Sequence, residues 1–416
     1  MLVCRLAAVL SVVALAVFAA GAMPVVSLLT VDAGEQIYEL EGHTALRIND
    51  PSAGRDVTVS WGVFDFNSPN FLYRFTKGET DYMCVAFPTG AVLHEYAVTG
   101  RRVTEQVLDL DSVQTERLVR LVEENLRPEN VTYRYNYVKD NCSLRPLAMI
   151  EAAVGDTLCL TSPGYFEYGY SGINEGGAHA EETTFRKEMS RYHSNYPWYQ
   201  FGIDLALGSG LDYAIMPRER AYAPLYLHDL LSSARTVGGK KLVTVENVLV
   251  PGVEGGTSLS PTPWYATPLA VAVYVLLVTL AVSVADLRRR RICRWFDSVF
   301  YGVLFLAGSL LTFLIFVSTH EATSPNWLYL WLNPLCVIPV VFEWIKSCRR
   351  VVYCYQFCNF AALVVLLACH RFLGQAFNVA FPILILCDLI RSVTYIYVYR
   401  TAFRKNNLRK AGVKTS

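Results

Sequence analysis

The sequence predicts an α+β exported domain followed by an all-α bundle of about five transmembrane helices. The chain has 416 residues, 53% of them hydrophobic, and a mean hydropathy of +0.29, which is high for a wholly soluble protein. The apolar residues collect at the N-terminus and after Trp264, whereas short strand-like and helical patterns alternate between them. A net charge of +1 gives none of the basic bias of a nucleic-acid-binding protein, and we expect no nucleic-acid partner.

The N-terminus has the features of a signal peptide. Arg5 supplies a positive charge, residues 6–18 form an apolar run, and Ala20, Gly21 and Ala22 provide the small residues that a signal peptidase requires. We therefore predict a signal peptide over residues 1–22. The alternative is an uncleaved first helix, and either interpretation exports the segment that follows.

The second half of the chain predicts a membrane bundle. Apolar runs of near membrane-spanning length lie at 264–285, 296–318, 327–345, 352–369 and 374–397. Clusters of Lys and Arg follow the first, third and fifth runs. The loops after the second and fourth runs contain a single such residue, Arg371. By the positive-inside rule those clusters are cytoplasmic, so the segment before Trp264 is outside, as the signal peptide also requires. The predicted protein is a multi-pass inner-membrane protein with a periplasmic domain.

These signals divide the chain into regions. We expect a periplasmic domain over 23–251, a Gly/Ser/Pro-rich linker over 252–263, the membrane domain over 264–399 and a basic cytoplasmic tail over 400–416. The loop after the second membrane run places polar side chains at the outer interface, and these are possible substrate contacts: His320, Asn326 and Asn333. The alternative interpretation of that loop is an aromatic belt around a proline turn.

Within the exported domain, strand-like patterns occupy 45–48, 57–64, 82–87 and 103–108, and helical patterns occupy 112–126 and 142–153. Residues 165–200 are rich in Gly, Tyr and charge, and we expect a long surface loop or an insertion there.

Three cysteines lie in this domain: Cys84, Cys142 and Cys159. An oxidising compartment favours pairing two of them. If Cys84 pairs with Cys159, Cys142 is the free thiol. No set of histidines and cysteines has the spacing of a metal site, and we expect neither a metal nor a cofactor.

Cys142 has a local context suited to chemistry. Asn141 is a good helix N-cap, and Pro146 is disfavoured deep inside a helix, so the helix should begin close to Cys142. A thiol at a helix N-terminus is expected to have a lowered pKa, and the exposed N–H groups there bind an oxyanion. The alternative is a buried structural cysteine beside a capping asparagine.

A thiol nucleophile requires a base, and His43 is the strongest candidate. Gly42 precedes it and strand-like alternation follows, which places His43 at the start of a strand. From there it could face a helix N-terminus across a cleft. The alternative is a surface histidine in a turn.

Four segments together resemble the Lnb-type lipoprotein N-acyltransferases. They are Gly-His-Thr-Ala-Leu-Arg at 42–47, Trp-Gly-Val-Phe-Asp-Phe at 61–66, Asp-Asn-Cys-Ser-Leu-Arg-Pro at 140–146, and the stretch from Pro197 to Gly208 with Asp212. A membrane bundle after an exported domain is also similar to that family, so the resemblance covers most of the chain. A histidine followed by a cysteine 99 positions later is similar to the circularly permuted papain-like folds of the NlpC/P60 and lecithin:retinol acyltransferase type.

The resemblance implies that His43 is the base and Cys142 the nucleophile. A third, orienting group would come from the strand after His43, which holds no second histidine, so Ser60 or Asp65 is the candidate. Asn141 would support the orientation of the site or the oxyanion. Arg47 and Arg145 are expected to be structural or to face a lipid headgroup.

The same resemblance implies an acyl transfer between lipids, without a cofactor. A phospholipid would donate an acyl chain to Cys142 as a thioester, and the α-amine of a diacylglyceryl-modified lipoprotein would accept it at the bilayer surface. Two other functions are compatible with the sequence. One is a membrane-tethered cysteine amidase or peptidase acting on the cell wall, for which one helix would suffice. The other is a non-catalytic envelope assembly protein.

Overall fold

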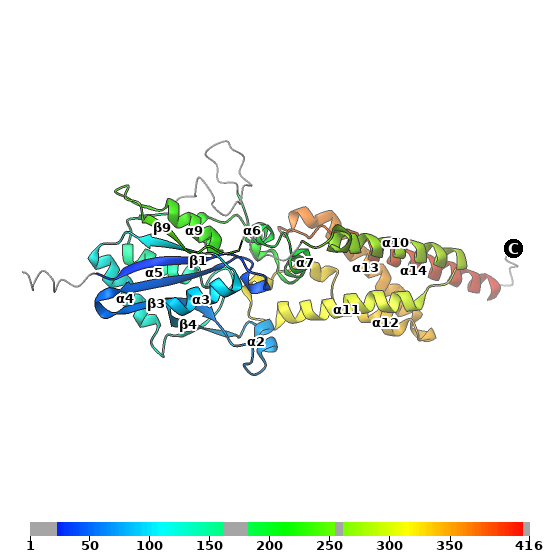
Figure 1. The fold of residues 1–416 in the computed structure, drawn as a ribbon. Helices are drawn as coiled ribbons and strands as arrows, with labels where there is room; N and C mark the ends of the chain where they lie inside the picture. The colour runs from blue at the N-terminus through cyan, green and yellow to red at the C-terminus, as the bar shows by residue number, and fades with distance from the viewer. Residues whose placement is uncertain (1–22, 161–181, 254–260, 411–416) are drawn as a thin grey trace, which may run out of the picture. The chain divides into compact units, whose positions relative to one another are not determined.

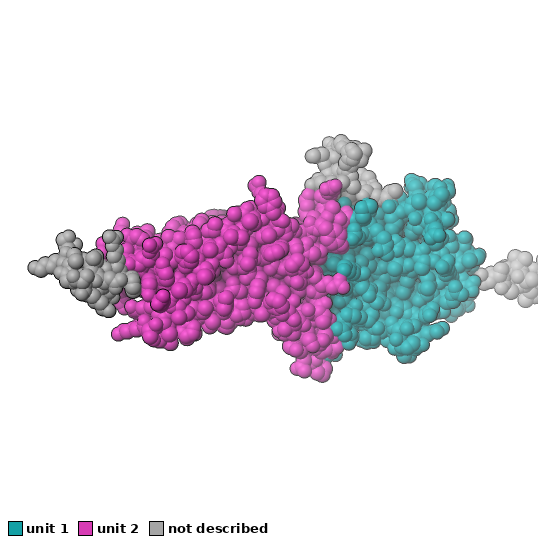
Figure 2. All heavy atoms as spheres, turned by 180° about the vertical axis from the view of Figure 1, so that it is seen from behind, with its two compact units in different colours: residues 1–68, 80–181, 216–259 teal, residues 69–79, 182–215, 260–416 magenta. Residues whose placement is uncertain are grey.

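The computed structural model describes residues 23–160, 182–253 and 261–410, with the side chains of 403–410 excepted. The predicted signal peptide lies outside the described residues. The chain forms two compact units (Figure 2): the first comprises 1–68, 80–181 and 216–259, and the second comprises 69–79, 182–215 and 260–416. Two segments of the predicted exported domain, 69–79 and 182–215, are therefore grouped with the C-terminal helices.

The first unit is built on an antiparallel sheet (Figure 1) with the order β6-β4-β3-β2-β1-β5-β9. Its strands are β1 (Val25–Val31), β2 (His43–Asp50), β3 (Arg55–Val63), β4 (Asp81–Pro88), β5 (Val103–Leu108), β6 (Thr132–Arg134) and β9 (Val243–Val250). A second small sheet pairs β7 (Leu158–Cys159) with β8 (Arg235–Thr236). The four strands expected from sequence correspond to β2, β3, β4 and β5, whereas β1, β6 and β9 were not predicted.

Helices cover both faces of this sheet. They are α3 (Thr89–Thr99), α4 (Ser112–Asn125), α5 (Leu144–Val154) and α9 (Pro224–Ser233), and the short helix α8 (Pro217–Arg220) packs against α9. Leu29 and Ala45 pack on the face that α3 covers, together with Tyr96 of that helix. Since side chains alternate along a strand, Trp61 points to the other face, where its Nε1–H donates to Asn125 at the end of α4 over 2.7 Å. Helices α5 and α9 both contact β2.

In the second unit, the described residues include four helices long and apolar enough to cross a membrane. They are α10 (Pro268–Arg289), α11 (Arg294–Phe316), α13 (Arg349–Cys369) and α14 (Phe381–Lys410). The apolar run predicted over 327–345 is helical but not as one regular helix. That run is divided into η6 (Trp327–Leu330), η7 (Pro334–Cys336) and α12 (Val337–Phe342), because Pro334 cannot continue the backbone hydrogen bonding of a preceding turn.

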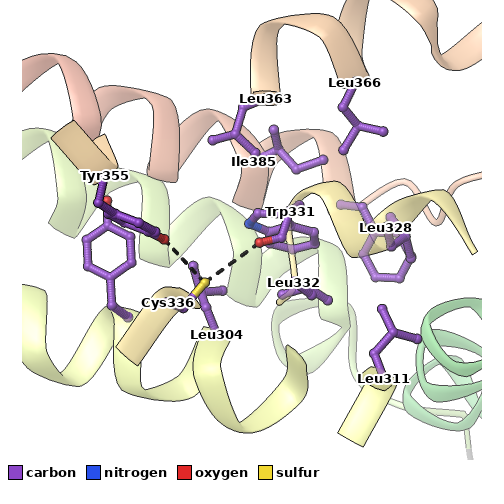
Figure 3. Close-up of a cluster of buried hydrophobic side chains, with 12 residues drawn as sticks. Leu304, Leu311, Leu328, Trp331, Leu332, Cys336, Tyr355, Leu363, Leu366 and Ile385 are labelled. Atoms are coloured by element: carbon purple, nitrogen blue, oxygen red, sulfur yellow. Dashed lines mark hydrogen bonds between the residues drawn. The ribbon is translucent and has the colours of Figure 1, made fainter. Parts of the chain in front are cut away.

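The broken segment contributes to the core of the bundle (Figure 3). Trp331 and Cys336 are buried among leucines of the neighbouring helices, including Leu304 and Leu363. The Tyr355 hydroxyl donates to Cys336 Sγ over 3.4 Å, and Cys336 Sγ lies 3.8 Å from the Trp331 carbonyl oxygen. The short helices thus bury Leu328, Trp331 and Cys336 in the bundle, whereas Leu335 and Val341 stay exposed on its outside.

Segment 182–215 carries α6 (Phe185–Tyr192), α7 (Pro197–Ala206) and η3 (Ser209–Leu211). The loop predicted over 165–200 is therefore wrong for residues 182–200, and residues 165–181 lie outside the described part. Buried Arg186 joins the two helices, with ion pairs to Asp212 (2.9 Å) and Asp204 (3.2 Å). Asn378 donates to Asp204 over 2.8 Å, which ties α7 to the segment that precedes α14.

We predict that Leu147→Ala destabilises the first unit by about 2–5 kcal/mol, because Leu147 of α5 is fully buried and the truncation leaves a cavity. Urea unfolding of the full chain in detergent, followed by pulse proteolysis, measures this free energy. The matched control is Val113→Ala at a position that is 72% exposed, for which we expect a change within about 0.5 kcal/mol. Equal effects of the two substitutions would contradict the packing of α5 described above.

Candidate active site

The cysteine singled out from the sequence precedes helix α5, which begins at Leu144. This confirms that the helix starts close to Cys142. Pro146 occupies the first turn of the helix, where its missing N–H is not required. As a whole residue, Cys142 is of intermediate burial, between the buried Asn141 and the buried Ser143.

The side chain of Asn141 determines where Cys142 sits. Its Oδ1 accepts hydrogen bonds from the N–H groups of Ser143 (3.0 Å) and Leu144 (2.9 Å). Its Nδ2 donates to the carbonyl oxygens of Tyr137 (2.9 Å) and Tyr222 (2.8 Å). Both amide hydrogens are therefore engaged, so Asn141 orients the helix start and has no N–H left for an oxyanion.

The Cys142 thiol meets strand β2 at its first residues. The backbone of Thr44 hydrogen-bonds the sulfur. A Cβ added to Gly62, near the end of β3, would lie 3.7 Å from Cys142 Cβ and 3.7 Å from the Tyr135 ring. The nucleophile candidate is thus enclosed by the start of β2, the end of β3 and an aromatic side chain.

His43 is the first residue of β2, as the sequence predicts. Gly42 before it has a φ of +80°, and a Cβ there would lie 2.5 Å from the Val31 carbonyl oxygen, so only glycine fits. The residue that follows His43, Thr44, is the one whose backbone contacts the Cys142 sulfur. Two segments far apart in the sequence therefore meet at the start of β2.

Ser60 is hydrogen-bonded to His43, with 2.6 Å between Ser60 Oγ and His43 Nε2. Ser60 pairs with Ala45 across β2 and β3, which puts its side chain on the same face as His43 and diagonally opposite it. When Nε2 carries the proton and donates to Ser60, Nδ1 keeps a free lone pair that can accept a proton. Within the described residues, no hydrogen bond joins His43 to Cys142.

A cavity of about 120 Å³ lies beside His43 on the α3 face of the sheet. Its apolar walls come from β1, β2, β4, β5 and α3, and its polar lining residues are His43, Thr58, Ser60, Glu95 and Tyr96. An apolar cavity next to a candidate base suits a substrate with a hydrocarbon chain.

Burial sets the protonation of both candidate groups. It lowers the pKa of His43 to about 4, with the positive charge of Arg101 acting in the same direction. Burial raises the pKa of the Cys142 thiol to about 12, which outweighs the hydrogen bonding from Thr44. The expectation of a lowered thiol pKa is therefore wrong. At neutral pH the site holds a neutral thiol and a neutral imidazole.

The other candidates of the first unit are satisfied by neighbouring protein groups. Exposed Asp65 accepts from the N–H of Asn67 in its own turn (2.8 Å). Arg47 pairs with Asp56 (2.7 Å) and Glu105 (2.8 Å). These partners give both residues structural roles, and Ser60 rather than Asp65 contacts His43.

The side chain of Arg145 is likewise paired with neighbouring protein groups. It makes hydrogen bonds of 2.6 and 2.7 Å to the two carboxylate oxygens of Asp140, and its guanidinium lies 3.5 Å from the centre of the Tyr133 ring. This arrangement braces the loop before Cys142 against β6 and leaves the charge of Arg145 balanced.

The three interface candidates of the second unit also bond to protein. His320 Nε2–H donates to the Phe75 carbonyl oxygen over 2.8 Å. Asn326 is buried, donates to the Leu205 carbonyl oxygen and caps η6. Asn333 caps η7 through the N–H of Leu335. Their side chains hold the outer loop in shape, and none of these bonds involves the first unit.

The pairing of Cys84 with Cys159 that the sequence left open is not present: both thiols are free, Cys84 buried and Cys159 exposed. Cys142 is free as well. Among the described residues, no group of three or more His, Cys, Asp and Glu side chains is arranged to hold a metal ion.

Sequence reasoning missed Arg101. Its guanidinium is buried, donates to the Asp32 carbonyl oxygen (2.7 and 2.9 Å) and pairs with Glu39 over 2.8 Å. Through space it lowers the pKa of His43. An arginine pair directly before a predicted strand was the available signal, but its burial depends on the tertiary fold.

Comparison with known families covers both halves of the chain. Residues 19–165 match the Lnb N-terminal periplasmic domain, and residues 260–402 match the Lnb transmembrane domain. The order of the two matches is the order of the two regions predicted from sequence. No curated protein and no solved structure matches the chain.

We predict that alkylation of Cys142 by iodoacetamide accelerates about tenfold per pH unit between about pH 7 and 10, because only the thiolate reacts and the thiol pKa is about 12. Peptide-level mass spectrometry of the full chain in detergent measures the rate at Cys142 alone. The unfolded chain is the control, and its rate should level off near the ordinary thiol pKa. A plateau below pH 8 in the folded protein would contradict a neutral thiol.

Proposed function

Because the chain belongs to the Lnb family, we propose that it is a lipoprotein N-acyltransferase that uses Cys142 as its nucleophile. Family membership indicates a lipoprotein-processing membrane enzyme, and the chain is a multi-pass membrane protein with a periplasmic N-terminal domain. The observation that carries the proposal is the contact of the Cys142 thiol with the strand that begins at His43.

The first half-reaction forms a thioester. Cys142 Sγ attacks an ester carbonyl carbon of a phospholipid while His43 Nδ1 takes the thiol proton. Collapse of the tetrahedral intermediate breaks the carbon–oxygen bond, and His43 returns the proton to the departing alcohol oxygen. Lysophospholipid leaves and the acyl chain stays on sulfur. A neutral thiol and a neutral imidazole suit this route, since proton transfer then accompanies the attack.

The second half-reaction forms an amide. The free α-amine of a diacylglyceryl-modified lipoprotein attacks the thioester carbonyl carbon, and His43 accepts a proton from the amine. Breaking the carbon–sulfur bond releases the Cys142 sulfur, which recovers the proton from His43. The products are an N-acylated lipoprotein and the original enzyme. Water must be kept from the thioester, because hydrolysis would compete with the amine.

The oxyanion donors differ from those expected at a helix start. The N–H groups of Ser143 and Leu144 are bonded to Asn141. The backbone of Thr44 and the backbone of Cys142 itself are the groups that hydrogen-bond the sulfur. We propose that their N–H groups stabilise the developing oxyanion, because they already face the reacting atom.

The membrane helices supply the lipid environment that the proposed reaction requires. Extracting an acyl chain from the bilayer costs about 0.8 kcal/mol per CH₂ group, which a soluble domain would have to offset for the donor and the acceptor. An enzyme anchored by several spanning helices meets both substrates where they already lie. This argument also weighs against a cell-wall amidase or peptidase, for which a simple tether is sufficient.

We predict that Cys142→Ala abolishes lipoprotein N-acylation, because no other group at the start of β2 can form the thioester. Mass spectrometry of the mature lipoprotein N-terminus, in cells that hold no other N-acyltransferase, measures triacylation. Cys159→Ala, which removes an exposed free thiol of the same unit, is the matched control and should leave triacylation intact. Normal triacylation in the Cys142→Ala strain would end the proposal and favour a structural cysteine.

We predict that Ser60→Ala lowers the acylation rate by about tenfold to a hundredfold, because His43 loses the partner that fixes its tautomer and ring orientation. Ser60→Thr, which keeps the hydroxyl, should recover most of the rate. The two variants should have the same urea midpoint. If Thr and Ala are equally slow, the hydroxyl has no role in positioning His43.

A further inference from the structure

Helix α2 (Phe71–Lys77) lies in the connection between β3 and β4, yet it belongs to the second unit. Residues in the left-handed conformation bound it: Asn70 with a φ of 55° and Gly78 with a φ of 78°. A helix of seven residues is too short for its hydrophobic periodicity to be recognised in the sequence. Its position follows from the residues that it packs against.

Those partners are at the outer end of helix α11 and in the loop that follows. The Tyr73 ring lies 6.0 Å from the Phe313 ring, measured between centroids. The Thr319 N–H donates to the Lys77 carbonyl oxygen over 2.8 Å, and His320 bonds the Phe75 carbonyl oxygen. A Cβ on Gly78 would lie 2.7 Å from Thr319 Oγ1, so the approach is close. Figure 1 shows α2 beside this end of α11.

The depth of α2 follows from that of α11. Helix α11 begins at Arg294, directly after the basic cluster that lies in the cytoplasm, and ends at Phe316. Phe313 is three residues before that end, which is about 4.5 Å along the helix axis. The Tyr73 ring therefore lies at the level of the last turn of a membrane-spanning helix, where hydrocarbon meets headgroups.

The side chains that α2 exposes are apolar. Leu72 is 76% exposed, Tyr73 55% and Phe75 47%. The basic side chains of the same helix bond to Glu79. Arg74 donates to the Glu79 carbonyl oxygen (3.0 Å), and Lys77 pairs with the Glu79 carboxylate (2.7 Å). A seven-residue helix with this pattern is poorly suited to water.

Exposed aromatic residues recur at the outer ends of two other spanning helices, α10 and α13. Trp264 and Tyr265 precede α10 and are 79% and 56% exposed, and Phe372 follows α13 and is 89% exposed. This is the aromatic belt typical of a membrane interface. Leu72, Tyr73 and Phe75 continue that belt and the lipid-facing surface of α11.

We propose that α2 inserts into the periplasmic leaflet and binds phospholipid acyl chains through Leu72, Tyr73 and Phe75. The occupant is lipid rather than another protein, because the surface is continuous with that of a spanning helix. The chain that joins β3 to β4 is thereby held in the bilayer interface. Binding of lipid by α2 does not depend on the chemistry of Cys142.

Photo-crosslinking tests the insertion directly. The full chain carries p-benzoylphenylalanine in place of Leu72 and is reconstituted in phosphatidylethanolamine and phosphatidylglycerol vesicles. Leu306 of α11, which is 68% exposed, is the lipid-facing reference position. Ser190 of α6, exposed on the same unit, is the water-facing control. After illumination, mass spectrometry counts lipid adducts at each position.

We expect lipid adducts at positions 72 and 306, and at least about tenfold fewer at 190. Adducts at 306 without adducts at 72 would overturn the proposal. Crosslinks from 72 to another protein in place of lipid would also overturn it and would identify a protein-binding surface.

A second arm rests on the proposed function. The double variant Leu72→Asp/Phe75→Asp should transfer acyl chains from vesicle phospholipid about tenfold more slowly, and Ser190→Asp should not. With substrates dispersed in detergent, the double variant should match the wild type. Equal rates of the double variant and the wild type in vesicles would show that α2 is dispensable for access to lipid. A wild type that transfers nothing would count against the acyl transfer alone, since crosslinking requires no turnover.

Discussion

The arrangement of the candidate site depends on one buried amide. Asn141 is 2% exposed, and its side chain makes hydrogen bonds to the start of α5, to the preceding loop and to Tyr222, two residues before α9. Each buried backbone group left without a partner costs about 1–3 kcal/mol. The segments that meet at Asn141 therefore cannot shift independently, and Cys142, next in sequence, is fixed with them against the start of β2.

The electrostatics of the site follow from where that contact lies. Partial burial disfavours both the thiolate and the imidazolium, and the buried cation of Arg101 adds to the effect on His43. A pair of neutral groups is easier to place beside apolar walls and hydrocarbon substrates than an ion pair, whose desolvation is costly. In the proposed reaction, charge then develops only in the transition state, and the backbone N–H groups at the sulfur are the donors proposed to stabilise it.

Much of the first unit could be predicted because its strands alternate. Strand β5 was predicted with its observed bounds, and Ser60 followed from its position on the strand after His43. Strand β1 was missed, since it is buried on both faces and lacks alternation. The break around Pro334 was missed because hydropathy measures composition rather than backbone continuity. The burial of Arg101 arises from contacts between distant segments, which no local pattern encodes.

The raised pKa of Cys142 has a consequence for a protein whose first unit lies in the periplasm. Oxidants and disulfides attack thiolates, and an oxidising compartment is hazardous to any cysteine that is ionised at rest. A sulfur that keeps its proton reacts slowly with them, and the described cysteines of this unit form no disulfide. The same burial that makes the Cys142 thiol hard to ionise thus preserves its reduced state without a dedicated reductant, as the proposed nucleophile requires.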